Sequence, residues 1–206
     1  MSKVLGRVTS INVRKVLWAL DELGEAYERE DWGLPQRDPR VPQFLALNPN
    51  GTVPVLIEDD GTVLSESNSL LVYLAQTRRR LLPTVPAEMG RALQWLGWQA
   101  TELSTAWGYA VMALIRHAPG YDEADKIAAA MEKWSGKMAI LEAELQKGRP
   151  FIAGDGLSVA DIALGLSLHR WFKLPADKAP MPAAEAYYQR LRARAAGARW
   201  MPDDYG

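Results

Sequence analysis

Residues 48–57 decide how the first part of the chain folds, and they read NPNGTVPVLI. The first four are turn-forming residues, and the branched apolar run after them is typical of a strand. Residues 59–61, DDG, then predict a hairpin turn. Pro54 interrupts the apolar run, although proline cannot donate a ladder hydrogen bond. Two interpretations stay open here: an ordinary edge-strand proline, or a cis Val53-Pro54 bond that turns the backbone before the strand begins.

The segments on either side of this stretch alternate between strand-like and helix-like periods. The pattern predicts strands at residues 3–6, 26–30, 53–57 and 62–64. Between and after them it predicts a helix over 13–23, a helical turn at 44–47 and a helix over 67–77. The order βαβαββα predicts an α/β domain over residues 1–80.

Beyond residue 83 the strand patterns disappear. The remaining sequence predicts an all-helical domain over residues 87–206, separated from the first by a proline-containing linker at 81–86. Its expected helices are one long helix over 88–115, a second over 123–147, a third that starts at residue 158 and a fourth over 182–196.

The start of the third of these helices is unusually well marked. Ser158 and Asp161 have the spacing of a capping box, with a hydroxyl at the N-cap and a carboxylate three residues later. Leu157 and Ile162 flank it at the positions of a hydrophobic staple. We expect a structural helix start without a ligand role, in which each cap contributes about 1 kcal/mol to stability.

The composition excludes several classes of function. The 206 residues carry 24 Lys and Arg against 25 Asp and Glu, which does not predict a face for nucleic acid or anionic membrane. The absence of cysteine excludes disulfides, cysteine-based zinc sites and a cysteine nucleophile. The two histidines, His117 and His169, are interpreted as structural or surface residues, so no metal is expected. The N-terminus does not resemble a secretory signal, and we expect a cytoplasmic protein.

Two strand-to-helix junctions carry polar side chains that could bind a ligand. Ser67, beside Glu66, is a candidate N-cap, and the first amides of its helix could bind an anion. The alternative is a capped helix that binds nothing. Ser10 and Asn12 mark the other junction, where a simple cap is again the alternative. Both junctions open on the same side of the sheet if the first and last strands are antiparallel with neighbouring ends.

Taken together, these segments resemble the cytosolic glutathione S-transferases, specifically the bacterial theta-like, serine-type group. The resemblance covers essentially the whole chain, with its motifs in the right order and at the right spacing. It is carried by SINVRKV at 10–16, NPNGTVPVL at 48–56, ESNSLLVYL at 66–74 and GDGLSVADIA at 154–163.

The resemblance implies a thioredoxin-like N-terminal domain, a C-terminal helical bundle and glutathione as co-substrate. It implies that Val53 precedes a cis-proline, Pro54, and pairs its backbone with the cysteinyl part of glutathione. The pair Glu66-Ser67 would hold the γ-glutamyl end. Ser10 would donate a hydrogen bond to the glutathione sulfur and favour the thiolate, with Asn12 as a second donor.

The family pattern is less clear at the other end of glutathione and around the second substrate. Thr52 stands where many relatives have Lys or Arg, so Trp32 and Thr52 are both candidates for holding the glycyl carboxylate. The resemblance also implies an electrophile pocket between the domains, for which Trp107 and Tyr109 are the candidates, and a homodimer.

Three functions are compatible with these residues. The first is a glutathione transferase that conjugates the thiolate to a small apolar electrophile. The second uses the same thiolate as a peroxidase or dehalogenase. The third is a binding module that has kept the fold without turnover. Because the chain has no cysteine, the reactive thiol in the first two would come from glutathione.

Overall fold

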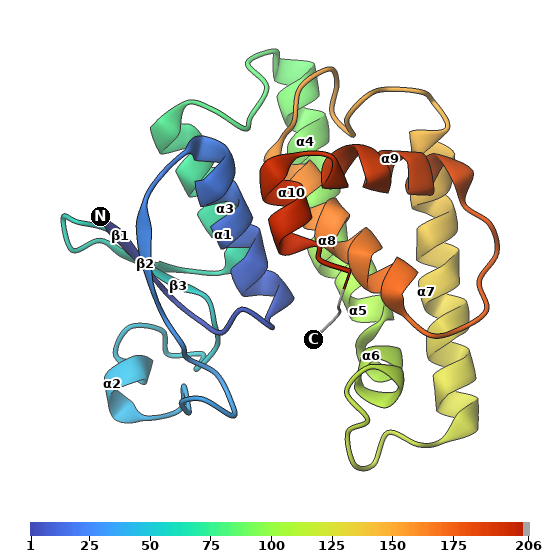
Figure 1. The fold of residues 1–206 in the computed structure, drawn as a ribbon, viewed down its shortest axis with the longest axis horizontal. Helices are drawn as coiled ribbons and strands as arrows, with labels where there is room; N and C mark the ends of the chain where they lie inside the picture. Colours follow the sequence, from blue (N-terminus) through green and yellow to red (C-terminus); the bar gives the residue numbers. More distant parts are fainter. Residues whose placement is uncertain (204–206) are drawn as a thin grey trace.

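Four strands form one mixed sheet (Figure 1), and their order is β2-β1-β3-β4. They are β1 (Ser2–Leu5), β2 (Tyr27–Glu30), β3 (Val55–Ile57) and β4 (Val63–Ser65). β1 pairs with β2 in parallel and with β3 in antiparallel register, and β4 pairs antiparallel with β3. The computed structural model describes residues 1–203 of the chain.

Helices cover both faces of this sheet. α1 (Ile11–Leu23) and α3 (Ser67–Arg78) pack on one face, and α2 (Pro42–Leu45) packs on the other. Successive strand residues point to opposite faces, so Val4 joins the large core under α1 and α3. Its neighbour Leu5 joins a smaller cluster with the phenylalanine of α2.

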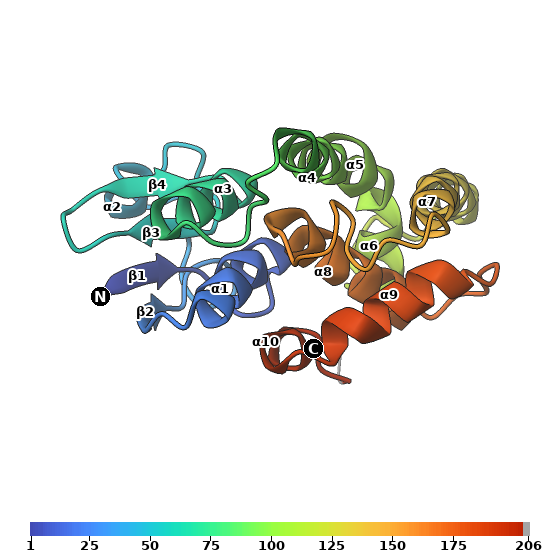
Figure 2. The same cartoon turned by 90° about the horizontal axis from the view of Figure 1, so that it is seen from above.

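The rest of the described chain is helical and lies beside the sheet domain, as Figure 2 shows from above. Within residues 1–203, no helix is long and apolar enough to cross a membrane. The elements are α4 (Pro86–Trp98), the π-helical turn η1 (Gln99–Leu103), α5 (Ser104–Ala106), α6 (Gly108–Leu114), α7 (Ala124–Leu145), α8 (Val159–Lys173), α9 (Pro182–Arg192) and α10 (Ala195–Trp200).

α8 is the central helix of this second domain and joins it to the first. It is buried along nearly its whole length and packs against α1, α3, α4 and α9. Gly165 permits the close approach, because a Cβ there would lie 2.9 Å from the ring of Trp18 and 2.8 Å from Leu191. A second contact between the domains joins α10 to α1: the Trp200 indole donates to the Asp21 carboxylate at 2.7 Å.

The structure confirms the predicted fold class and two of its local features. The first domain has the predicted βαβαββα order, and the second is helical. The Val53-Pro54 bond is cis, as the family resemblance implied. The capping box is formed, with the Asp161 carboxylate accepting from the Ser158 amide at 2.7 Å.

Three predictions were wrong in detail. The long helix expected over 88–115 is four separate elements, because a π-turn begins at Gln99 and the chain bends again at Trp107. The fourth expected helix is also divided, into α9 and α10. Ser67 is not an N-cap: it is the first residue of α3, and Glu66 occupies the cap position.

The two junctions lie at the same edge of the sheet, although the first and last strands are not antiparallel to each other. β1 and β4 both run antiparallel to β3, so they run in the same direction, separated by that strand. Their carboxyl ends therefore lie at the same edge of the sheet as the start of β3. This edge brings together the junctions before α1 and α3 and the Val53-Pro54 turn.

Candidate functional site

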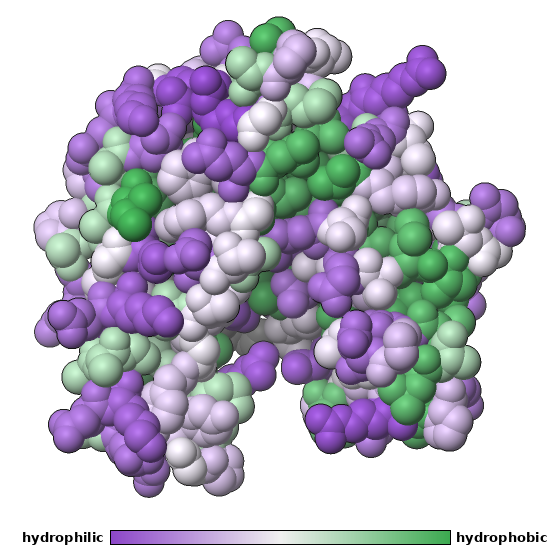
Figure 3. Space-filling view, turned by 180° about the vertical axis from the view of Figure 1, so that it is seen from behind, coloured by the Kyte–Doolittle hydropathy of each residue, from purple (hydrophilic) through white to green (hydrophobic). Residues whose placement is uncertain are grey.

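Three cavities follow one another from the N-terminus of α3 to the gap between the two domains. We call them the α3 cavity, the β3 cavity and the arginine cavity, with volumes of about 380, 580 and 340 Å³. Asn12 lines both the α3 and the β3 cavity, while Arg7 and Arg116 line both the β3 and the arginine cavity. Figure 3 shows the notch between the domains, with hydrophilic side chains along its rim. The shared residues make the three cavities parts of one site.

The α3 cavity lies at the start of α3. Its lining residues are Asn12, Lys15, Glu66, Ser67, Asn68, Ser69, Ala100 and Ser104. Ser67 is buried, whereas Glu66 is exposed and has a positive φ of 69° with ψ of 104°. A non-glycine residue in this region is strained, and such strain is concentrated at functional sites. Among the described residues, no side chain caps α3, so its first amides remain available to an anionic ligand.

A buried cation lies beside these amides. Lys15 is only 2% exposed, and its ammonium donates to Asn68 Oδ1 at 2.8 Å and to Gln99 Oε1 at 2.9 Å. Burial and, to a smaller extent, the nearby Arg170 lower the pKa of Lys15 to about 7, while Glu66 opposes the shift. Sequence reasoning missed this residue, because nothing in its local pattern on α1 distinguishes a buried lysine from a solvated one.

The π-turn in the helical domain supplies the second partner of this lysine. Gln99 opens the turn and is buried. Its amide nitrogen donates to Ser104 Oγ at 2.9 Å and to Ser167 Oγ at 3.2 Å, while its oxygen accepts from Lys15. π-turns inside helices are frequent at functional sites. Here the turn brings Gln99 of the second domain into hydrogen-bond contact with Lys15, which lines the α3 cavity.

The β3 cavity contains the cis-proline turn and the loop after β2. Val53 and Thr52, two of the predicted binding residues, line it, and the Asn48 side-chain amide donates to the Thr52 carbonyl at 2.8 Å. Arg40 also lines this cavity and was missed by sequence reasoning. Trp32 is not among the lining residues: it is 6% exposed and packs against a phenylalanine of the smaller core cluster.

The two predicted thiolate donors differ in their placement. Asn12 is exposed and lies where the α3 and β3 cavities meet. Ser10 is the N-cap residue of α1 and half-buried, and it is not among the described residues that line the three cavities. A ligand that extends between the first two cavities must therefore pass Asn12.

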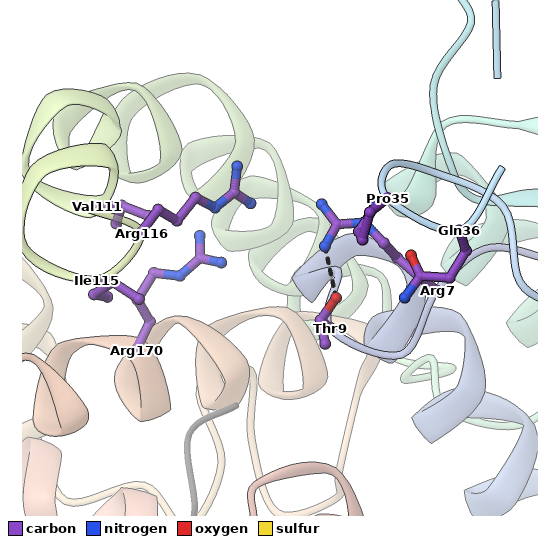
Figure 4. A pocket seen from close by; sticks show the side chains of 8 residues that line it. All are labelled: Arg7, Thr9, Pro35, Gln36, Val111, Ile115, Arg116 and Arg170. Atoms are coloured by element: carbon purple, nitrogen blue, oxygen red, sulfur yellow. Dashed lines mark hydrogen bonds between the residues drawn. The ribbon is translucent and has the colours of Figure 1, made fainter. Parts of the chain in front are cut away.

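The arginine cavity lies between the domains. Figure 4 shows Arg7, Thr9, Pro35 and Gln36 on one side, facing Val111, Ile115, Arg116 and Arg170 on the other. Trp107 and Tyr109 are not in this lining. Trp107 is buried, and the guanidinium carbon of Arg170 lies 5.1 Å from the centroid of its indole ring. The same indole packs edge-on against Trp134. Tyr109 packs against Tyr121.

Neither histidine contributes to these cavities. His169 is buried with its Nδ1 at 2.8 Å from the Tyr188 hydroxyl, and burial lowers its pKa to about 3. His117 is exposed on the loop after α6. Within residues 1–203, no group of three or more His, Cys, Asp or Glu side chains could hold a metal ion.

Family models match both parts of the chain. Residues 9–77 match the N-terminal domain of glutathione S-transferases, and residues 100–195 match the C-terminal domain of the same family. The two matches agree with the arrangement of a sheet domain followed by a helical one.

Individual relatives agree with these family models. The chain is 35% identical to glutathione S-transferase GstB of Escherichia coli over 95% of each chain. It is 30% identical to disulfide-bond oxidoreductase YfcG of the same organism, over 75% of this chain and 74% of that one. The theta class glutathione S-transferase of Xanthomonas axonopodis pv. citri, crystallised with glutathione bound, superposes with a TM-score of 0.92 at 32% identity, covering 100% of this chain and 99% of that one. The chain therefore belongs to the glutathione S-transferase family.

Proposed function

We propose that this protein binds glutathione along the α3 and β3 cavities and conjugates its thiolate to a small electrophile held in the arginine cavity. The observation that carries the proposal is the continuity of the three cavities, joined by Asn12 at one boundary and by Arg7 and Arg116 at the other. An extended tripeptide needs such a continuous site, and the second substrate must meet its sulfur near the middle.

The γ-glutamyl end fits the α3 cavity. Its α-carboxylate would accept from the open amides at Ser67, and its ammonium would pair with the exposed carboxylate of Glu66. Lys15 adds a positive charge beneath the carboxylate when it is protonated. The carboxylate of the γ-glutamyl end thus meets positive groups of the protein, and its ammonium meets a negative one.

The remainder of glutathione fits the β3 cavity. The backbone of Val53, before the cis Pro54, would pair with the cysteinyl amide, and Thr52 lies beside it. Arg40 is a stronger candidate than Trp32 for holding the glycyl carboxylate, because a guanidinium can form charge-assisted hydrogen bonds and Trp32 is in the core.

The thiolate is stabilised by a donor close to the sulfur. A free thiol has a pKa of about 8.5, and a hydrogen bond to a charged group contributes about 1.5–3 kcal/mol. One such bond lowers the thiol pKa by about one to two units, which populates the thiolate near neutral pH. Both Ser10 and Asn12 remain candidates, and the position of Asn12 in two of the cavities favours it.

The test is the thiol pKa of bound glutathione, measured from the ultraviolet absorbance of the thiolate in wild type, Asn12→Ala and Ser10→Ala. We expect Asn12→Ala to raise this pKa by about one unit and to lower turnover of 1-chloro-2,4-dinitrobenzene about tenfold. A shift in Ser10→Ala alone would assign the role to the serine. An unchanged pKa in both would exclude both residues as donors.

The alternative functions are separated by two further measurements. Heat of glutathione binding without turnover of any electrophile would indicate a binding module. Turnover of a hydroperoxide at a rate above that of 1-chloro-2,4-dinitrobenzene would favour the peroxidase. Release of halide from a haloalkane at such a rate would favour the dehalogenase.

We further propose a cytoplasmic homodimer that removes reactive electrophiles with the cytosolic glutathione pool. An open apolar groove of about 470 Å³ lies between α3 and α4, lined by Val72, Leu93 and Leu96 among others. Leu93 is 42% exposed, and a second copy of the chain would cover it. Light scattering of Leu93→Asp, expected to shift the protein toward monomer, tests this face.

A further inference from the structure

The arginine cavity is cationic, which is unusual for a pocket expected to hold an apolar substrate. Arg7 enters it from the loop after β1, Arg116 from the turn after α6 and Arg170 from α8 (Figure 4). Figure 4 shows the guanidinium groups of Arg116 and Arg170 extending across the gap toward Arg7. These residues are far apart in sequence, and the packing of the two domains brings them together.

The rest of the lining is apolar or neutral. Val111, Ile115 and Pro35 are apolar, and Thr9 and Gln36 are polar without charge. Among the residues of this lining that lie within the described chain, none is acidic. The cavity therefore has an apolar side from α6 and a positive charge at its rim.

The proximity of the Arg7 and Arg116 guanidinium groups is electrostatically unfavourable. Burial lowers the pKa of the Arg7 guanidinium, and the positive charge of Arg116 lowers it further. Within residues 1–203, the Arg7 guanidinium donates to one side chain, the neutral Thr9 hydroxyl, from Nη1 at 2.6 Å. Like charges at close range repel, and an oxyanion placed between them would turn this repulsion into charge-assisted, often bidentate hydrogen bonds.

In the proposed arrangement, both carboxylates of glutathione have partners outside the arginine cavity. Its γ-glutamyl carboxylate has the open amides of α3 and Lys15. Its glycyl carboxylate has Thr52 and Arg40 in the β3 cavity. The acid of that cavity, Asp38, accepts from the backbone amide of Arg40 at 2.8 Å and does not line the arginine cavity.

We propose that the arginine cavity binds an acidic group of the second substrate, so that this protein conjugates glutathione to small electrophiles that carry a carboxylate or similar oxyanion beside an apolar reactive part. The proposal rests on the proposed function, because it assigns the electrophile to that same site. It changes the expected substrate class from apolar to amphipathic.

The reaction that follows is a substitution with balanced atoms. With 4-chloro-3-nitrobenzoate, the thiolate sulfur forms a bond to the carbon that carries chlorine, and the C–Cl bond breaks. Chloride leaves with the bonding electron pair, and the proton of the glutathione thiol has already gone to solvent. The benzoate carboxylate is unchanged and serves only as the group that the arginines recognise.

The experiment compares 4-chloro-3-nitrobenzoate with 4-chloro-3-nitrobenzamide, which has nearly the same shape and no charge. Each kcat/KM is divided by the rate constant of the same compound with glutathione in buffer, because the two rings differ in intrinsic reactivity. We expect the normalised value to be about tenfold or more higher for the acid, the size of one charge-assisted hydrogen bond. We also expect this preference to fall as salt is raised.

Arg116→Gln is the decisive variant, because Arg116 is exposed and its loss leaves the core intact. It should lower the ratio of the acid's normalised kcat/KM to that of the amide about tenfold. Arg116→Lys should retain most of the acid's advantage. Lys133→Gln, an exposed site on α7 outside the arginine cavity, removes the same charge and should leave this ratio unchanged.

Three outcomes would overturn the proposal. The first is equal normalised turnover of acid and amide by wild type. The second is an Arg116→Gln effect of equal size on both compounds with a raised glutathione KM or a raised thiol pKa, since the arginine would then serve glutathione. The third is absence of turnover of both compounds. In that case, turnover of 1-chloro-2,4-dinitrobenzene by the same preparation shows that the proposed function stands, and its absence overturns both.

Discussion

The N-termini of α3 and α8 differ in whether the protein itself supplies hydrogen-bond partners for the first backbone amides of the helix. At α8, the first helical amide, that of Val159, donates to the Leu81 carbonyl at 2.9 Å, and Ser158 and Asp161 form a capping box. The Asp161 carboxylate is fully buried and accepts from the amides of Ser158 and Ile152 and from the Tyr187 hydroxyl. At α3, the cap position is held by exposed Glu66 with a positive φ, and within the described residues no side chain caps the helix.

The difference shows how one structural feature serves two purposes. Each α-helix begins with amides that lack an intrahelical partner. At α8 the protein supplies the partner, and the gain is stability of the helical core. At α3 no described side chain supplies it, and the proposed function assigns these amides to glutathione. Predictions that separate stability from glutathione affinity therefore test this comparison.

The largest expected effect is loss of stability on removing the buried carboxylate. Asp161→Ala leaves several buried donors without an acceptor, so the free energy of unfolding should fall by about 3–5 kcal/mol. Chemical denaturation measures this change. Asp155→Ala, an exposed site in the same segment, is the control and should be nearly neutral. A loss below about 1 kcal/mol for Asp161→Ala would contradict the assigned role.

The second prediction makes the same substitution at both helix starts. Ser67→Ala should weaken glutathione binding about tenfold, because it removes a hydrogen bond to the ligand carboxylate, and should leave the unfolding free energy nearly unchanged. Ser158→Ala should lower the unfolding free energy by about 1 kcal/mol and leave glutathione affinity unchanged. Calorimetry measures the glutathione affinity of each variant, and chemical denaturation measures its free energy of unfolding.

The comparison fails if the two serine variants behave alike. Equal loss of stability in both would mean that Ser67 is a structural residue. Equal loss of glutathione affinity would mean that the capping box acts on the site at a distance.

The smallest predicted effect is a pH dependence from Lys15. Its pKa is lowered to about 7 in the folded protein from an ordinary value of 10.5, so it loses its positive charge as pH rises through about 7. Affinity for an anionic ligand beside it should therefore fall about fivefold, or about 1 kcal/mol, between pH 6 and pH 8.5. S-methylglutathione is the ligand to use, because it has no thiol that titrates.

The same shift has a consequence for stability with a definite sign. Between pH of about 7 and 10.5 the unfolded chain holds a proton on Lys15 that the folded chain has lost. The free energy of unfolding therefore receives a contribution from Lys15 that rises with pH across this window. Lys15→Met should flatten the pH dependence of both S-methylglutathione affinity and the free energy of unfolding. Lys133→Gln should leave both dependences unchanged. A wild-type affinity for S-methylglutathione that is constant with pH would contradict the role of Lys15.

Local features of this protein could be predicted from the sequence. The capping box spans four residues, and its hydrogen bonds connect neighbours in the chain, so Ser158 and Asp161 suffice to identify it. The same holds for the strand and helix order of the first domain, which follows from hydrophobic periods and turn residues. The cis Val53-Pro54 bond was predicted only through the family resemblance, because the local sequence alone favoured an ordinary edge-strand proline.

Other features of the site were decided by tertiary structure alone. The pKa of Lys15 depends on burial by α3 and η1, and the charge of the arginine cavity comes from residues at positions 7, 116 and 170. The long helix expected over 88–115 was wrong because helical propensity does not show where a turn widens to place Gln99. A sequence determines the interactions between near neighbours directly. Desolvation and the meeting of distant charges exist only once the domains have packed, and here they set the chemistry of the site.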